Sequence, residues 1–284
     1  AMLAEWHVLR EDAPGTGKTQ LAKALAATVQ GTHARIQFTP DLLPSDVTGI
    51  TIYDQATHKF EFHKGPVFAS IVLADEINRA SPKTQSALLE VMEEGRVTID
   101  GTSHDAGRPF MVIATQNPIE QAGTYKLPEA QLDRFLIKTS IGYPDLASAE
   151  QILAGSATRD RAAAIPPVIA TNTIVEISEL LTEVHTDPTL LRYTAQLAEE
   201  TRRDPHTRLG VSVRGSLAMI RAAKVWAASE GRTYVLPDDI KQLAIPVWQH
   251  RLVMDPDAEF AGVTAENVIA RVLADVAPPQ SRAA

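Results

Sequence analysis

The chain has 284 residues, enough to bury a substantial core, and its length predicts about two domains. Its 27 Lys and Arg against 35 Asp and Glu leave a net charge of −8, which disfavours general attraction to nucleic acid or to anionic membranes. The absence of cysteine excludes disulfides, thiolate metal sites and a cysteine nucleophile, and it fits a reducing compartment, so we expect a cytoplasmic protein.

The sequence lacks the features of a membrane-spanning or a secreted protein. The longest apolar stretch, near residues 67–74, falls far short of the ~20 residues that span a bilayer, so we expect no membrane span. The first residues lack the basic and apolar regions of a signal peptide. The first predicted strand already begins at Val8, and we therefore expect that an N-terminal segment is missing.

Residues 1–150 are predicted to form an α/β core with a largely parallel sheet, because short apolar runs alternate with helical patterns. Helices are predicted at Thr19–Gln30 and Ser81–Glu94, the second with Ser81 as N-cap and Pro82 at its first position. The predicted strands are Val8–Arg10, Arg35–Phe38, Ser70–Ala74, Phe110–Thr115 and Phe135–Ser140.

Two stretches interrupt this alternation and read as β-hairpin inserts. Residues 50–62 alternate β-branched and aromatic residues around a polar centre. Residues 95–104 alternate in the same way and carry the turn signal Asp100-Gly101.

Beyond Tyr143 the pattern becomes helical, and we find no convincing strand there. A small-residue-rich linker is expected at 151–170, a smaller all-helical domain at 171–276 and a disordered tail at 277–284. Asp187, Ser212 and Thr264 are candidate caps. The predicted helices are Asn172–Val184, Pro188–Arg203, Val213–Glu230, Pro237–His250 and Thr264–Leu273.

The first motif that carries chemistry is Asp12-Ala13-Pro14-Gly15-Thr16-Gly17-Lys18-Thr19, between a predicted strand and a predicted helix. In a phosphate-binding loop, glycines let backbone N–H groups curl around a phosphate, the lysine neutralises the β and γ oxygens, and the threonine hydroxyl binds Mg²⁺. Asp12 stands where the first glycine of the pattern is usual. The context still predicts a nucleotide-binding loop.

The second motif is Ile71-Val72-Leu73-Ala74-Asp75-Glu76, an apolar strand that ends in two carboxylates. Ligands bind at the carboxyl edge of a parallel sheet. Paired with a phosphate loop, the motif is typical of Walker B, in which Asp75 holds the magnesium shell and Glu76 polarises the attacking water. A third strand ends in Thr115-Gln116-Asn117, which would place Asn117 beside Asp75, where it could orient that water or contact the γ-phosphate.

With these residues in place, the sequence resembles the MoxR group of AAA+ ATPases, in the helix-2-insert clade. The resemblance rests on APGTGKT, on LADEINRASPKTQSALLEVMEEGRVTIDG and on ATQNPIEQAGTYKLPEAQLDRF. It continues through RLGVSVRGSLAMIRAAKVWA and YVLPDDIKQLA, and so covers nearly the whole chain. It implies an AAA+ core of the P-loop NTPase type followed by a helical lid. It also implies a homo-oligomeric, hexameric ring with ATP between subunits and both hairpins near its central face.

The resemblance also assigns roles by position. Asn117 matches sensor 1, and Arg134 matches the arginine finger that reaches the γ-phosphate held by a neighbouring subunit. Arg214 matches sensor 2, which faces the nucleotide of its own subunit. Here Val213-Arg214-Gly215 replaces the commoner Pro-Arg-Ala. The residues expected to contact ATP or Mg²⁺ are Pro14, Gly15, Thr16, Gly17, Lys18, Thr19, Gln20, Asp75 and Arg214, with Thr19 and Asp75 on the metal.

The sequence thus predicts a Mg²⁺-dependent ATPase that remodels, assembles or activates protein complexes, with a von Willebrand factor A-type protein as the implied partner. One alternative is a motor subunit of a metal-chelatase complex, which shares this architecture. Another is a non-hydrolysing, nucleotide-gated scaffold, against which Glu76, Asn117 and Arg134 all argue. A DNA-dependent motor is a weaker alternative because of the net charge.

Overall fold

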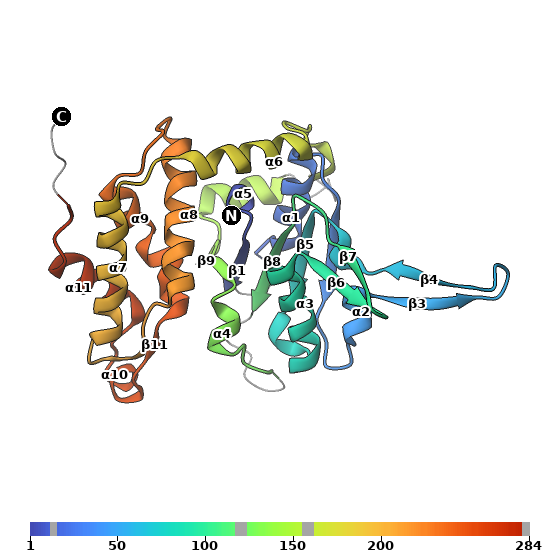
Figure 1. Cartoon of the computed structure of the whole chain (residues 1–284), viewed down its shortest axis with the longest axis horizontal. Helices are drawn as coiled ribbons and strands as arrows, with labels where there is room; N and C mark the ends of the chain where they lie inside the picture. Colours follow the sequence, from blue (N-terminus) through green and yellow to red (C-terminus); the bar gives the residue numbers. More distant parts are fainter. Residues whose placement is uncertain (12–15, 117–123, 155–161, 280–284) are drawn as a thin grey trace.

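The centre of the molecule is a five-stranded parallel sheet with the strand order β2-β5-β8-β1-β9 (Figure 1). The structure is a computed structural model that describes residues 1–11, 16–116, 124–154 and 162–279. The predicted strands are confirmed. Their bounds are β1 (His7–Glu11), β2 (His33–Gln37), β5 (Ile71–Asp75), β8 (Met111–Gln116) and β9 (Phe135–Thr139).

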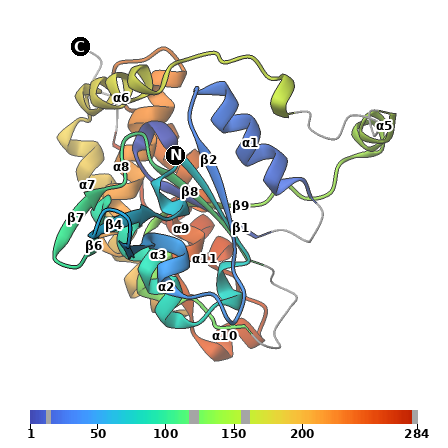
Figure 2. The same ribbon diagram turned by 90° about the vertical axis from the view of Figure 1, so that its right-hand side faces the viewer.

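Helices cover both faces of this sheet, which explains why its central strands are nearly continuous apolar runs. Every residue of β5 is buried. Helix α1 (Lys18–Thr28) lies on one face, where Ala22 and Ala26 pack against Ile71 and Leu73. Helices α2 (Pro44–Thr48) and α3 (Pro82–Glu94) lie on the other face (Figure 2).

The ends of α3 follow from its sequence. Ser81 accepts a hydrogen bond from the N–H of Thr84, and Pro82 occupies the first turn. At the other end Gly95 adopts φ 66° and donates its N–H to the carbonyl of Val91. Because α3 follows β5 and runs back across the sheet, it begins at the carboxyl edge and ends at the amino edge.

Both predicted hairpins are present. Strands β3 (Gly49–Asp54) and β4 (Lys59–Lys64) form an antiparallel pair that extends away from the body of the molecule (Figure 1). Strands β6 (Arg96–Ile99) and β7 (Thr102–Asp105) form the second pair. Its turn residues Asp100 and Gly101 have φ 50° and 76°, as a type I′ turn requires.

The C-terminal region folds as a helical lid beside β9. The predicted caps are confirmed, because Asp187, Ser212 and Thr264 accept backbone N–H groups of the first turns that follow them. The lid has its own core, which includes Tyr193 and Trp248. Its helices are α6 (Thr171–Leu180), α7 (Pro188–Arg203), α8 (Val213–Ser229), α9 (Pro237–Trp248), α10 (Pro256–Phe260) and α11 (Ala265–Asp275).

The expectation of no strand beyond Tyr143 is wrong, because β10 (Thr207–Leu209) pairs antiparallel with β11 (Val253–Met254). Strands of three and two residues are too short to show a period of two. Four further helices of the described residues were not predicted either: α2, α4 (Glu129–Leu132), α5 (Leu146–Ala154) and α10. Of these, α5 runs into the predicted linker.

Part of the predicted tail, residues 280–284, lies outside the described residues. Among the residues that the structure describes, no helix combines the length and the apolar character needed to cross a membrane. Short 3₁₀ turns complete the fold at η1 (Met2–Ala4), η2 (Pro66–Phe68), η3 (Ile77–Arg79), η4 (Ala162–Ala164), η5 (Leu181–Glu183) and η6 (Gln249–Arg251).

A buried histidine joins three of these elements at the amino edge of the sheet. His7 of β1 accepts the N–H of Val112 at Nδ1 (3.0 Å), so Nε2 carries the proton that it donates to the carbonyl of Met92 (2.9 Å). Burial lowers the pKa of His7 to about 4. The folded protein therefore holds His7 neutral at a pH where the unfolded chain would protonate it.

This difference makes stability depend on pH. Between the unfolded pKa near 6.5 and the folded value near 4, the unfolded state binds more protons, so the free energy of unfolding falls as the pH is lowered. The drop from His7 is about 3 kcal/mol at 1.36 kcal/mol per pKa unit. Urea unfolding at pH 7 and at pH 4 measures it. His250, whose pKa burial also lowers, adds to the same slope.

The matched variant is His7→Gln, which cannot titrate. It is expected to be less stable than the wild type at pH 7 but to lose less stability on acidification. Equal losses in the two proteins would contradict the assignment.

Candidate functional site

The carboxyl edge of the sheet carries the first turn of α1, which follows the predicted phosphate loop in the sequence. Gly17 caps α1 with φ 83°, a conformation that favours glycine, and Lys18, Thr19 and Gln20 form the first turn. A helix N-terminus presents backbone N–H groups and a partial positive charge to an anion. Thr16 lies just before this turn, whereas Pro14 and Gly15 lie outside the described residues.

Asp75 and Glu76 lie at the same edge, where β5 ends. The carboxylate of Asp75 is nearly buried; it accepts a hydrogen bond from the hydroxyl of Thr115 (2.6 Å) and forms an ion pair with Arg35 of β2 (2.7 Å). The same Thr115 hydroxyl accepts the backbone N–H of Glu76 (2.9 Å). The wholly buried Thr115 of β8 thus fixes both acidic residues relative to the neighbouring strand.

Glu76 has a strained backbone, with φ 56° in the left-handed region. Non-glycine residues in this region cost energy and concentrate at functional sites. Its carboxylate accepts hydrogen bonds from Arg79 (2.8 Å) and from the amide of Gln37 at the end of β2 (3.1 Å). The two carboxylates thus have different partners, since Asp75 is held by Thr115 and Arg35, and Glu76 by Arg79 and Gln37.

The donors at this edge fit a magnesium ion bound together with phosphates. Mg²⁺ prefers oxygen ligands and usually takes one or two from the protein while keeping waters and substrate oxygens. Asp75 offers a carboxylate and Thr19 a hydroxyl, and α1 packs against β5. Asn117, the third predicted contributor, lies outside the described residues, directly after β8.

Arg134 and Arg214 lie at the opposite edge. Arg134 directly precedes β9, and Arg214 is in the first turn of α8. Both guanidinium groups bind the carboxylate of Glu93 at the end of α3, Arg134 through Oε2 (2.5 Å) and Arg214 through Oε1. These three residues line a cavity of about 510 Å³ between the core and the lid, together with Trp6 and others.

The structure therefore changes the interpretation of Arg214. The resemblance implied that Arg214 faces the nucleotide of its own subunit, but Arg214 lies beside Arg134 on the carboxylate of Glu93. The five residues of β1 separate the two edges by about 16 Å at 3.3 Å per residue. Arg79, the other arginine near the acidic motif, lies at the carboxyl edge with Glu76.

Comparisons with known proteins agree with this architecture. The model of the ATPase family associated with various cellular activities (AAA) matches residues 7–137, and that of the AAA lid domain matches residues 199–272. The chain is 47% identical to the uncharacterized protein YeaC of Bacillus subtilis, over 100% of this chain and 89% of YeaC. It is 41% identical to the chaperone MoxR1 of Mycobacterium tuberculosis, over 99% of this chain and 77% of MoxR1. The chain belongs to the MoxR family of AAA ATPases.

A solved structure from Cytophaga hutchinsonii matches this MoxR-family chain with a TM-score of 0.91 and 38% identity, over 98% of this chain and 87% of that one. The core and the lid are thus both arranged as in that structure. The contacts that hold the lid against the core were not predicted from the sequence.

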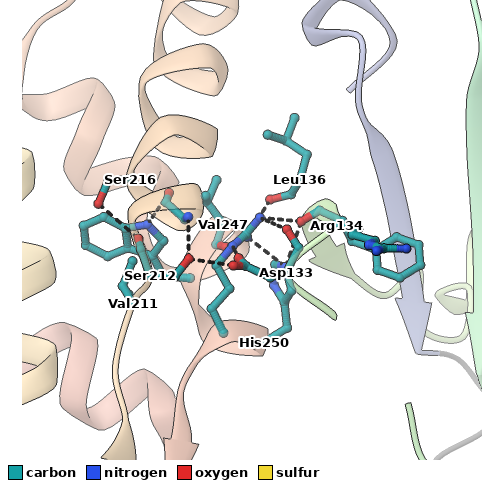
Figure 3. A network of polar contacts seen from close by, with 12 residues as sticks. Asp133, Arg134, Leu136, Val211, Ser212, Ser216, Val247 and His250 are labelled. Carbon is teal, nitrogen blue, oxygen red and sulfur yellow. Dashed lines mark hydrogen bonds and ion pairs between the residues drawn. The ribbon is translucent and has the colours of Figure 1, made fainter. Parts of the chain in front are cut away.

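The lid of this MoxR-family protein is joined to the core by polar contacts around Asp133, which Figure 3 shows close to Ser212 of the lid. Asp133, next to Arg134, accepts a hydrogen bond from the hydroxyl of Ser212 (2.6 Å) and pairs with Nε of Arg251 (2.7 Å). The Arg251 side chain is 1% exposed and also donates to the carbonyls of Phe135 (2.6 Å) and Leu136 (3.1 Å). Burial lowers the pKa of Arg251, and the contact with Asp133 opposes that shift.

The contacts of Asp133 with Ser212 and Arg251 form the joint between lid and core. This joint gives a physical reason for Gly215 in place of the commoner alanine. A Cβ at position 215 would lie 2.8 Å from Cδ of Arg251 and 2.8 Å from Cγ1 of Val211. Trp248, the last residue of α9, donates its indole N–H to the carbonyl of Gly215 (3.0 Å). Gly215 therefore makes room for the arginine that holds the lid.

Asp133 and Arg251 were missed from the sequence, as were Glu93, Thr115, Arg35 and Gln37. Asp133 had a signal, since it stands beside Arg134 in the same motif. Arg251 had none, because it follows a helix and its partner lies 118 residues away.

The joint predicts a large loss of stability when one partner is removed. Asp133→Ala leaves the Arg251 charge buried and unpaired, which is expected to cost about 3–5 kcal/mol in urea unfolding. In Asp133→Ala/Arg251→Met the uncompensated charge is gone, so the double variant is expected to regain part of that loss. A double variant whose loss equals the sum of the two single losses would contradict the pairing.

Proposed function

We propose that this MoxR-family AAA ATPase hydrolyses ATP between the subunits of a homo-oligomeric ring and uses the energy to remodel partner proteins. One observation carries the proposal: the groups suited to bind and attack ATP lie at one edge of the sheet, and the two arginines lie at the other. A single chain cannot bring Arg134 to a nucleotide held by Lys18. A second copy can, and repetition of such a head-to-tail contact closes into a ring, for which six subunits are the expectation.

At the carboxyl edge, Lys18 would neutralise phosphate charge while the first turn of α1 binds phosphate oxygens. Thr19 and Asp75 would hold Mg²⁺, which when bound offsets the charge on the β and γ phosphates. Glu76 would accept a proton from the attacking water, and Asn117 would orient that water. The further nucleotide contacts in this proposal are Pro14, Gly15, Thr16, Gly17 and Gln20.

At the amino edge, Arg134 and Arg214 would both meet the γ-phosphate of the neighbouring subunit. Positive groups placed where charge develops in the transition state stabilise it more than the ground state. Their shared contact with Glu93 supports treating them as a pair. In this proposal Arg214 serves the same nucleotide as Arg134.

The remodelling part of the proposal draws on the chaperone named among the relatives and on the β3–β4 hairpin. That hairpin exposes apolar side chains, including Ile50, Ile52, Tyr53 and Phe60, the last 74% exposed. Exposed apolar groups of this kind favour protein contacts. A protein with a von Willebrand factor A-type domain is the partner class that we propose to test first.

Glu76→Gln is expected to separate binding from hydrolysis. The amide keeps the size of the side chain but cannot accept the proton, so turnover should fall by about 10²–10⁴-fold. ATP affinity, measured with a fluorescent analogue, should stay close to that of the wild type. Lys18→Ala should instead lose binding. Turnover by Glu76→Gln at the wild-type rate would contradict the assigned role.

Mixing two inactive variants tests whether Arg134 acts on a neighbour. Arg134→Ala is expected to lose about 10³–10⁵-fold in kcat. Its nucleotide site is intact, and Lys18→Ala keeps an intact arginine pair, so mixed rings should regain part of the phosphate release at saturating ATP. Light scattering or native mass spectrometry confirms that mixed rings form. Mixed rings that form and remain inactive would refute the trans mechanism.

A further inference from the structure

We propose that Glu93 positions both arginines for the transition state, so that one carboxylate of α3 sets the geometry of the arginine pair. The proposal rests on the function proposed above, because it assumes that Arg134 and Arg214 act on a nucleotide held by another copy. Glu93 itself would not touch that nucleotide. It would act through the two guanidinium groups that it holds.

The contacts show a shared carboxylate with one oxygen for each arginine. Oε2 of Glu93 accepts from Nη2 of Arg134 (2.5 Å), and Oε1 accepts from Nη2 of Arg214. Arg134 comes from the core and Arg214 from the lid. Glu93 therefore brings together two groups from different domains.

The charges around the cavity show why a carboxylate is needed between the two arginines. Arg134, Arg214, Arg221 and Lys224 all line it, and the acidic side chains among its described lining residues are Glu93 and Glu5. Glu5 is engaged by Arg108, which leaves Glu93 to offset the repulsion between the two arginines. Without that carboxylate, two adjacent guanidinium groups would take rotamers that separate them.

Glu93 has no evident role in stabilising its own helix. It lies in the last turn of α3, where a negative charge is unfavourable because it adds to the negative end of the helix dipole. Its ion pairs are partly exposed, with 34% of the Glu93 side chain accessible, and such pairs contribute little to folding. The position of Glu93 is therefore better explained by the geometry of the arginine pair than by the stability of the fold.

The contacts also leave the arginines able to bind phosphate. A guanidinium has five N–H donors, and each arginine uses Nη2 toward Glu93. The side chains of Arg134 and Arg214 remain 24% and 39% exposed beside the 510 Å³ cavity. A phosphate could thus bind both groups while Glu93 still holds them, so the carboxylate orients the pair without blocking it.

The test uses the full chain and the variant Glu93→Gln. We expect kcat to fall by about 10²-fold, the scale of a misplaced catalytic group, with KM for ATP within about twofold of the wild type because the nucleotide is held at the other edge. The matched control is Glu94→Gln, an exposed neighbour that carries the same charge change. It is expected to keep wild-type kcat. Loss of activity in both variants would point to a general charge effect and overturn the proposal.

Mixing experiments then assign Glu93 to one edge of the sheet. Rings of Glu93→Gln and Lys18→Ala subunits should regain activity, because each supplies what the other lacks. Rings of Glu93→Gln and Arg134→Ala subunits should regain none, because both are defective at the amino edge. A variant that had merely lost its fold would rescue neither, and circular dichroism with thermal unfolding checks the fold directly.

The outcomes separate this proposal from the function on which it rests. If Arg134→Ala and Lys18→Ala fail to complement in mixed rings, the trans mechanism itself is wrong. If they complement but Glu93→Gln is fully active, only the role of Glu93 is wrong. If Glu93 acts through the two arginines, adding Glu93→Gln to the double variant Arg134→Ala/Arg214→Ala should slow it no further, whereas a further multiplied loss would overturn the proposal.

Discussion

All five strands of the sheet run in one direction, and the other functional features depend on that constraint. Parallel strands have their carboxyl ends at one edge of the sheet, and the first turn of α1 with Lys18 lies at the same edge as Asp75 and Glu76. The residue before β9 must then lie at the other edge, which is where Arg134 is found. Among the described residues, the acidic motif and the start of α1 thus lie at one edge of the sheet, and the arginine pair lies at the other.

The lid extends the amino edge and is held there by buried polar contacts. Arg251 and Ser212 both bind Asp133, so the start of α8, with Arg214, is fixed next to the start of β9. A buried, paired arginine is costly to move, because any displacement exposes an unmatched charge to an apolar environment. The lid and the strand that follows Arg134 are therefore expected to move as one body at this joint.

The sequence predicted the sheet well, because strands buried on both faces must be apolar, and Ile71-Val72-Leu73-Ala74 is such a run. It also predicted the helix caps, which depend on one local side chain. Glu93 could not be found, because Glu93 and Glu94 form an acidic pair on an exposed helix face until the fold brings two arginines to one of them. Local sequence patterns were enough to predict most of the helices and strands, and the motifs. The arrangement of the arginines depends on contacts between distant residues, which those patterns do not show.

Helix α3 connects the two edges within one subunit. It starts a few residues after Glu76 and ends at Glu93, and its 13 residues span about 20 Å at 1.5 Å per residue. Its buried face packs on the sheet through Leu88, Leu89 and Met92, so the helix cannot bend without losing those contacts. In a ring of the proposed kind, a displacement near Glu76 of one site would reach the arginines that serve the next site through a rigid element. Helix α3 alone could then couple two neighbouring nucleotide sites of the ring.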